Sequence, residues 1–331
     1  MIVAPEPCIE GYDIIGDVHG CHDALVALLE RMGYALRNGV YQCPGRKVVF
    51  LGDIIDRGRH IRETFWLVRR MVDAGVAWFI LGNHEFNAVT YATRAPAGWE
   101  RPFIARRTRR LIRQLLQTLK QFRGRTDEWQ EMIRWLRKQP LLLEFPHFRA
   151  VHACWDADKI RRLRQLNPAC TLENEAFLLA AADWRNEERR IIERLLKGIN
   201  VRLPEGFTIR GSDGVERDQF RSAFWHAEPV TYGDLVFQPD GLPQELQARA
   251  LTDEEKSVLT HYPPHEKPLF VGHYWRQGEP SLLTPNIACL DYSAVRAGLL
   301  VAYRMGLEST LDPSHLVWVK AGGEHKNKNR A

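Results

Sequence analysis

Three short apolar runs in the first quarter of the chain each end in glycine or lead directly to one, and polar side chains follow. Residues 12–17 read YDIIGD, residues 47–53 read KVVFLGD, and residues 76–81 read VAWFIL before GNHE. Runs of this length predict buried strands, and helical spacing over 24–32 and 61–74 separates them. Alternating strands and helices predict a layered α/β fold, in which ligands bind beyond the carboxyl ends of the strands.

Further elements follow with longer stretches between them. Helical spacing predicts helices at 103–122, 126–139, 158–166 and 172–197. Short apolar runs predict strands at 141–145, 148–151, 268–271, 286–290, 299–303 and 316–319. Residues 198–265 are rich in Gly, Pro and turn residues, and we assign no order of elements there.

Candidate site residues recur from position 17 to position 273. We therefore predict one catalytic domain over residues 1–320, with insertions at about 94–140 and 156–265, and a disordered tail at 321–331. The chain has no apolar run of the ~18 residues that cross a membrane, and its first residues lack a secretory signal pattern. Its six cysteines are scattered and form no CxxC pair. Reduced thiols of this kind favour a cytoplasmic location with no membrane partner.

Metal-type ligands follow strand-like runs at five places. They are Asp17 with His19, Asp53, Asn83 with His84, His152, and His273. A single Asp or His after a strand is more often a cap, a turn or a hydrogen-bonded core residue. The three motifs GDVHG, GDIIDRG and GNHE, in this order along the chain, are a much more specific indication of a metal site. Carboxylate, imidazole and amide groups together suit Mn, Fe or Zn better than calcium or magnesium.

These motifs resemble those of the calcineurin-like metallophosphoesterases, in the phosphoprotein-phosphatase branch. GHYW from Gly272 and LDYSA from Leu290 are similar to the C-terminal motifs of bacterial symmetrical diadenosine tetraphosphatases. The likeness covers about the first 155 residues and residues 268–305. It implies a layered α/β/β/α sandwich with helical insertions.

The resemblance also implies a role for each residue. One metal ion would be held by Asp17, His19 and Asp53, and a second by Asp53, Asn83, His152 and His273. His84 would be the general acid, oriented by Asp56, and Arg57 would hold phosphate oxygens. A second phosphate-binding arginine is expected between the last two histidines, where Arg221 is preferred over Arg210 and Arg217.

Elementary chemistry agrees with these roles. Two cations ~3.5–4 Å apart need a shared ligand, which a carboxylate can supply, and a hydroxide that bridges them attacks phosphorus in line. A histidine beside a carboxylate is suited to protonate the leaving group. An arginine offers a planar fork that matches phosphate oxygens.

Several side chains near these motifs keep two interpretations. His84 can be a metal ligand instead of the acid, and Asp56 with Arg57 can be a surface ion pair. Asp291 can support the site or simply end a strand. Glu85 is expected to cap the helix after GNHE, and packing is the favoured interpretation for Cys21 and Cys154.

The segment from Arg101 to Arg125 contains eight Arg, one Lys and no acidic residue. The chain's net charge of +5 includes these nine cations, so the remainder has a net charge of −4. The segment is either a rim that attracts polyanions or the solvated face of an inserted helix.

Two functions follow. The first is two-metal hydrolysis of phosphate esters or anhydrides, in a phosphorylated small molecule, a dinucleoside polyphosphate or a phosphoprotein. The alternative is a nucleic-acid-binding module that uses the basic helix on a phosphatase-like scaffold.

Overall fold

The fold was analysed in a computed structural model of the chain. The structure describes residues 1–331 except 211–215, 238–241, 297 and 323–331. Most of the tail predicted at 321–331 therefore lies outside the described residues.

The described residues form a six-stranded mixed sheet. Its strands pair in the order β14 (Asp291–Tyr292), β15 (Leu299–Met305), β1 (Gly11–Ile15), β4 (Arg46–Phe50) and β5 (Ala77–Phe79), and β16 (Leu316–Lys320) also pairs with β15. The strands β1, β4 and β5 are parallel, whereas β15 runs antiparallel to its neighbours. The three parallel strands are those predicted from the apolar runs, so their carboxyl ends meet at one edge.

A second sheet has the strand order β13 (Ile287–Cys289), β12 (Leu269–Val271), β7 (Arg149–Val151) and β6 (Leu142–Glu144). An apolar layer joins the two sheets. Ile14 pairs with Val49 in the first sheet, and both lie in one core cluster with Phe270 of the second sheet and with Phe148, which precedes β7. Alternate residues such as Phe50 point to the opposite face and pack in the other core cluster.

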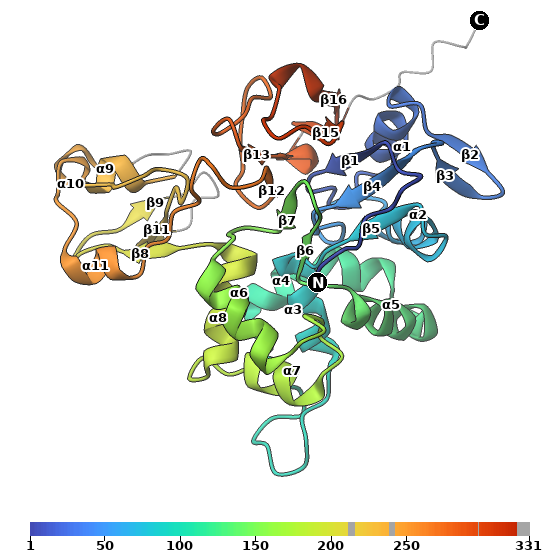
Figure 1. The fold of residues 1–331 in the computed structure, drawn as a ribbon. Helices are drawn as coiled ribbons and strands as arrows, with labels where there is room; N and C mark the ends of the chain where they lie inside the picture. The colour runs from blue at the N-terminus through green and yellow to red at the C-terminus, as the bar shows by residue number, and fades with distance from the viewer. Residues whose placement is uncertain (211–215, 238–241, 297, 323–331) are drawn as a thin grey trace, which may run out of the picture.

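Helices cover the outer faces and complete the layered α/β/β/α sandwich (Figure 1). They are α1 (His22–Arg31), α2 (Ile61–Asp73), α3 (Asn83–Ala92), α4 (Arg109–Gln121), α5 (Thr126–Lys138), α6 (Ala157–Leu166), α7 (Glu175–Ala181) and α8 (Glu187–Lys197). Helices α1 and α2 contact strands of the first sheet, and α4 packs on both α2 and α3. In the described residues, no helix is both long and apolar enough to cross a membrane.

The region without a predicted order forms small elements at the left of Figure 1. Its hairpin-like pairs are β8 (Asn200–Arg202) with β11 (Gln219–Arg221), and β9 (Ile209–Arg210) with β10 (Glu216–Arg217). Three short helices follow: α9 (Tyr232–Leu235), α10 (Gln244–Gln247) and α11 (Asp253–Ser257). Near the N-terminus, β2 (Ala35–Arg37) and β3 (Val40–Gln42) form another pair. The division into one domain with two insertions stays a prediction.

Two predicted helices are shorter than the sequence pattern indicated. The helix predicted at 103–122 begins only at Arg109, because Thr108 caps it and accepts a hydrogen bond from Leu111 N at 3.2 Å. Phe103 lies before it, in an isolated bridge with Arg94.

The helix predicted at 172–197 is interrupted between α7 and α8. At the break, the Asp183 carboxylate accepts hydrogen bonds from both the backbone N–H and the guanidinium of Arg185. Such local side-chain bonds compete with the helical ladder. The break leaves Trp184 69% exposed.

Candidate metal and phosphate site

The predicted ligands come together at one edge of the two sheets. Asp17 and His19 follow β1, Asp53 follows β4, Asn83 and His84 begin α3, His152 follows β7, and His273 follows β12. All seven side chains are buried. The arrangement arises because the strands preceding them run parallel within each sheet.

Asp53 lies at the centre of the cluster. Its Oδ2 is 3.7 Å from His19 Nε2, 3.7 Å from His84 Nε2 and 3.5 Å from His152 Nε2. Two overlapping groups of potential ligand atoms share this carboxylate, His19–Asp53–His84 and Asp53–His152–His273. A shared carboxylate between two ligand groups is what a pair of divalent ions requires.

The histidine rings present lone pairs toward Asp53. His19 Nδ1 donates to Ile55 O at 2.8 Å, and His152 Nδ1 donates to Leu51 O at 2.7 Å, which in the neutral imidazole leaves each Nε2 as an acceptor. His152 Nε2 then faces Asn83 Oδ1, another acceptor, at 3.2 Å. Among the described residues, His19 Nε2 has no hydrogen-bond partner although it is buried. Buried acceptors that converge without donors fit divalent metal ions.

Asp17 is buried beside these groups. Burial and the nearby carboxylates of Asp291 and Asp53 raise the pKa of Asp17 well above its usual range. The backbone N–H of His273 is 3.3 Å from both of its oxygens. Asp17 lies outside the two ligand groups defined by the other side chains. Asp291 is thus not only a strand residue, because it also faces the carboxylate predicted to bind the first metal.

His84 forms a dyad with Asp56. His84 Nδ1 donates to Asp56 Oδ2 at 2.6 Å, and both side chains are buried. Thr118 of α4 completes the arrangement, since its hydroxyl donates to Asp56 Oδ1 and accepts from Asp56 N at 3.0 Å. The dyad favours the acid role, while the 3.7 Å separation of His84 from Asp53 preserves the ligand alternative. Sequence analysis missed Thr118, because no motif surrounds it.

Arg57 lies beside the dyad and faces the same cleft. Its Nη2 is 3.3 Å from His84 Nε2, and its guanidinium lies 4.5 Å from the ring centre of Trp275. Arg57 is therefore not a surface ion-pair residue of Asp56, whose carboxylate is used by His84 and Thr118. Trp275 stands within the GHYW motif, a signal that the sequence interpretation did not use.

The preferred second arginine also reaches the cleft. Arg221 Nη1 donates to His273 O at 3.1 Å, and the side chain is half-buried. Arg217 lines the cleft as well, whereas Arg210 is absent from the lining that the described residues form. Two of the three candidate arginines, Arg217 and Arg221, therefore line the cleft.

The cleft over the site has a volume of about 1270 Å³ and is rich in cations. Among the described residues, its lining contains nine basic side chains against four acidic ones: Arg57, Arg101, Arg106, Arg110, Arg185, Arg189, Lys197, Arg217 and Arg221 against Asp53, Glu100, Asp183 and Glu193. Such a surplus of positive charge attracts polyanions.

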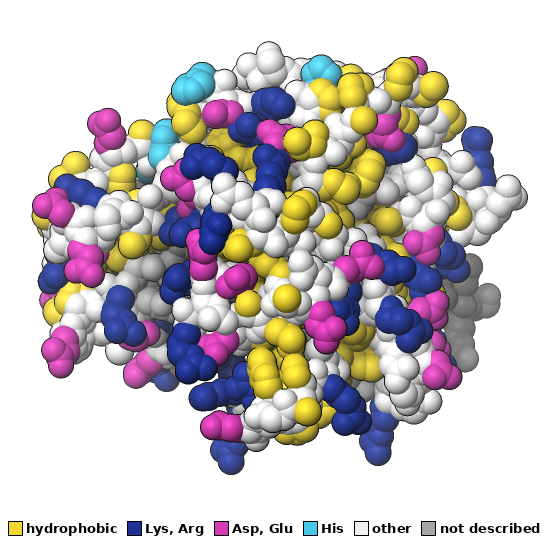
Figure 2. Space-filling view, turned by 60° about the horizontal axis from the view of Figure 1, so that its bottom comes forward, with side chains coloured by type: hydrophobic (Ala, Val, Ile, Leu, Met, Phe, Trp, Pro, Cys, Tyr) yellow, Lys and Arg dark blue, Asp and Glu magenta, His cyan; other side chains and the backbone are white. Residues whose placement is uncertain are grey.

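The basic segment at 101–125 contributes only three of these cations to the cleft, Arg101, Arg106 and Arg110. Arg107 instead stacks on Tyr91. Figure 2, which brings the bottom of Figure 1 forward, shows Lys and Arg side chains over this face with acidic ones between them. Part of the basic segment at 101–125 therefore lines the rim of the cleft, and another part is exposed to solvent.

Glu85 has a larger role than the expected helix cap. Its carboxylate accepts from Gly82 N at 2.9 Å, which caps α3. It also accepts from the backbone N–H groups of Asp53 at 2.8 Å, Ile54 at 2.9 Å and Ile55 at 3.4 Å. The side chain is fully buried. Glu85 therefore ties the loop that carries Asp53 to the start of α3.

Several site residues have backbone conformations that only glycine adopts easily. The φ angles are 45° at His19, 50° at Asp53, 67° at Asp56, 66° at Arg57 and 63° at His273. Each such residue costs of order 1–3 kcal/mol, and strain of this kind clusters at functional sites.

Two glycines permit close approach of the carboxylates. A Cβ at Gly82 would overlap Asp53 Oδ1, and a Cβ at Gly272 would overlap Asp17 Oδ1. The glycines in these motifs thus allow the loops to pack against the ligands.

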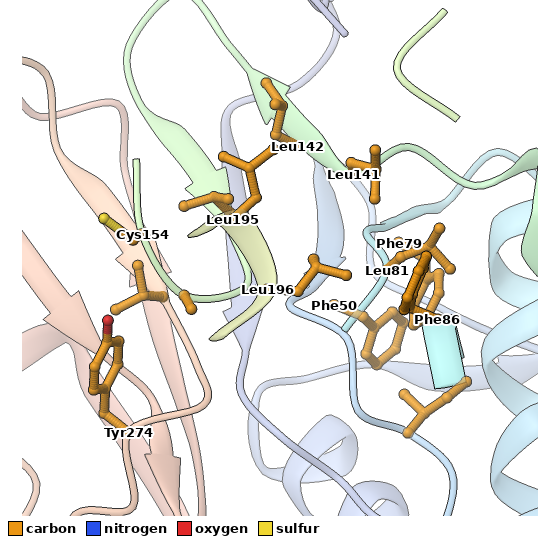
Figure 3. Packing of buried hydrophobic residues seen from close by; sticks show 14 of the residues in the cluster. Phe50, Phe79, Leu81, Phe86, Leu141, Leu142, Cys154, Leu195, Leu196 and Tyr274 are labelled. Atoms are coloured by element: carbon orange, nitrogen blue, oxygen red, sulfur yellow. The ribbon is translucent and has the colours of Figure 1, made fainter. Parts of the chain in front are cut away.

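The cysteines beside the ligands are packing residues, as expected. Cys154 is fully buried in the core cluster that also contains Phe50, and Figure 3 shows it with Leu195 and Tyr274. Cys21 is partly buried and packs against the same core.

Known proteins that are similar to this chain include phosphoesterases and phosphatases. Residues 12–163 match the family of calcineurin-like phosphoesterases, and a fold of this kind implies divalent metal ions. The matched segment includes four of the five ligand positions, those before His273.

Two named relatives match a shorter segment of the chain. The bis(5'-nucleosyl)-tetraphosphatase PrpE (asymmetrical) of Halalkalibacterium halodurans is 47% identical over 74 residues, which are 22% of this chain and 30% of that protein. The protein of the same name from Bacillus subtilis (strain 168) is 42% identical over 74 residues, with the same coverage. The chain thus spans about 30% of the length of these relatives. Their names specify asymmetrical enzymes, whereas the C-terminal motifs resemble the symmetrical ones.

A solved structure of a cold-active protein tyrosine phosphatase has the same fold over most of the chain. The TM-score is 0.50 at 18% sequence identity, with 92% of this chain and 78% of that chain covered. At this identity the likeness concerns the fold alone.

Proposed function

We propose that this protein hydrolyses phosphoanhydride or phosphoester bonds with two divalent metal ions, and that a dinucleoside polyphosphate is its preferred substrate. The observation that carries the proposal is the convergence of His19, His84 and His152 on one oxygen of Asp53, at the base of a cationic cleft.

One ion would be held by Asp17, His19 and Asp53, and the other by Asp53, Asn83, His152 and His273. When bound, the ions would activate water and neutralise phosphate charge. The mixture of imidazole, carboxylate and amide donors supports Mn as the native metal, with Fe or Zn as alternatives.

The protein side chains would orient the phosphate and supply a proton. Arg57 and Arg221 would hold phosphate oxygens through their planar guanidinium groups. His84, held by Asp56, would donate a proton from Nε2 to the departing oxygen. The proton leaves with the product, and the ring is then protonated again from solvent.

The choice of substrate rests on two features. The cleft carries a surplus of cations, which suits a substrate with several phosphates. The relatives described above are named as tetraphosphatases of bis-nucleosyl substrates. A phosphoprotein is the second candidate within the same chemistry. We further propose that the protein acts in the cytoplasm, and that residues 1–320 act as one domain.

A substrate panel tests the proposal. Protein loaded with Mn is incubated with diadenosine tetraphosphate, nucleotides, inorganic tripolyphosphate and phosphopeptides, and released phosphate or nucleotide is measured. We expect His84→Ala to lower kcat by about 10²–10⁴-fold. The matched control His265→Ala changes an exposed histidine outside the cleft and should leave kcat unchanged. Absence of turnover with Mn, Fe and Zn would reject the enzyme proposal.

The nucleic-acid alternative has less support, because only three cations of the basic segment line the cleft. It predicts RNA or DNA affinity that falls steeply with salt and is lost when Arg106, Arg107, Arg109 and Arg110 are neutralised. Binding that is absent, or that ignores salt, would dismiss it.

A further inference from the structure

Trp184 is an unusual tryptophan in this protein. It is 69% exposed, and among the described Trp, Tyr and Phe residues it is the one whose side chain is largely exposed. A single exposed apolar side chain is common and needs no function by itself. The position and surroundings of Trp184 supply the argument.

The segment that carries Trp184 is held in place by local interactions. The Asp183 and Arg185 side chains form an ion pair at 2.6 Å on either side of it. Asn186 Nδ2 donates to Ala180 O at 3.1 Å and ties the break to the end of α7. The guanidinium of Arg189 lies 4.4 Å from the ring centre of Trp184. The indole is therefore oriented before any ligand arrives, which lowers the entropic cost of stacking.

Trp184 lines the same cleft as the candidate metal site. The cleft extends from Asp53 and His84 to Trp184 and to Trp99, which lies in the segment between α3 and α4. A cation accompanies Trp99 too, since the Arg101 guanidinium lies 5.3 Å from its ring centre. Both indoles therefore lie beside arginine side chains, in the cleft whose base is formed by the candidate metal ligands.

This combination fits a ligand that is aromatic at its end and polyanionic along its length. Arginine side chains suit a chain of phosphates, while an indole offers a face on which a nucleobase of any type can stack. The cleft has a volume of about 1270 Å³, which exceeds the ~300–1,000 Å³ of ordinary small-molecule pockets. This extra volume is consistent with a ligand that contains two nucleosides.

We propose that Trp184 is the stacking platform for a nucleobase of the substrate, and that Trp99 borders the same subsite. This inference rests on the proposed function, because it names the group that distinguishes a nucleoside polyphosphate from other phosphate substrates. Trp184 would determine specificity and would take no part in the chemical step.

The test compares diadenosine tetraphosphate with inorganic tripolyphosphate, which has phosphates but no base. Base–aromatic stacking is worth about 1–3 kcal/mol, so Trp184→Ala should raise KM for diadenosine tetraphosphate about 5- to 150-fold. Its KM for tripolyphosphate and its kcat for both should stay within about twofold of wild type. Trp184→Phe should restore most of the affinity, whereas Trp184→Leu, which is apolar without a π-face, should not. Val230→Ala is an exposure-matched control outside the cleft and should change nothing.

The outcomes separate the two proposals. Equal KM changes for both substrates, no change for diadenosine tetraphosphate, or full rescue by Trp184→Leu would overturn the platform and leave the hydrolase proposal standing. A rise in KM confined to a phosphotyrosine peptide would also overturn it, in favour of a protein substrate. If wild-type protein hydrolyses neither compound with any metal, the proposed function is wrong, and so is the proposal that Trp184 stacks on the substrate's nucleobase.

Discussion

The Glu85 carboxylate offers a quantitative test of how the protein holds Asp53 in place. One oxygen accepts from the N–H groups of Asp53 and Gly82, and the other from those of Ile54 and Ile55. In Glu85→Gln, one oxygen becomes an NH₂ group that cannot accept, so two buried N–H groups lose their partner whichever way the amide turns. A buried donor left unsatisfied costs about 1–3 kcal/mol, which gives about 2–6 kcal/mol in total.

The loss should be visible in both stability and metal binding. We expect the free energy of unfolding of Glu85→Gln, measured by urea denaturation in EDTA, to fall by about 2–6 kcal/mol. Because the Asp53 loop is then less constrained, affinity for Mn should fall about 10- to 100-fold. Glu63→Gln, an exposed substitution on α2, is the control and should stay within about 0.5 kcal/mol of wild type. A Glu85→Gln protein as stable as this control would refute the reasoning.

Three further predictions follow from the site and its surroundings. Thr118→Val removes the hydroxyl that orients Asp56 and should lower kcat about tenfold with little change in KM, whereas Thr118→Ser should keep wild-type kcat; equal losses in both variants would contradict this role. Gly272→Ala forces a Cβ against the Asp17 carboxylate and should reduce the bound metal measured by elemental analysis; full metal content would contradict the close approach. Burial raises the pKa of the Cys21 thiol to about 11 and that of Cys154 to about 12, so iodoacetamide at neutral pH should leave both unlabelled in peptide mass spectra, and rapid labelling of either would contradict their packing.

The site could be predicted largely from the sequence because its ligands follow local signals. Asp17, Asp53 and Asn83 each come after an apolar run, and parallel strands bring such positions to one edge. His152 and His273 follow the same rule in the second sheet. Their roles came from resemblance and stay proposals, since geometry alone also permits His84 as a ligand.

Other features could not be predicted because they depend on contacts between distant segments. Thr118 meets Asp56 across 62 positions, only because α4 packs on α2 and α3. The break at Trp184 was missed because apolar spacing continues through 172–197, while the ion pair of Asp183 and Arg185 acts locally. Residues 198–265 have no regular sequence pattern, and the described residues among them form short paired strands and short helices.

We propose that Asp53 would be a ligand of both divalent ions at the base of the cleft. The most direct measurement is anomalous scattering at the manganese edge from crystals grown with Mn. We expect two peaks, one on either side of Asp53, with one beside His19 and the other beside His152 and His273, and we expect the loss of both in Asp53→Asn. Absence of peaks at Asp53, or two peaks that persist unchanged in Asp53→Asn, would contradict the two-metal site.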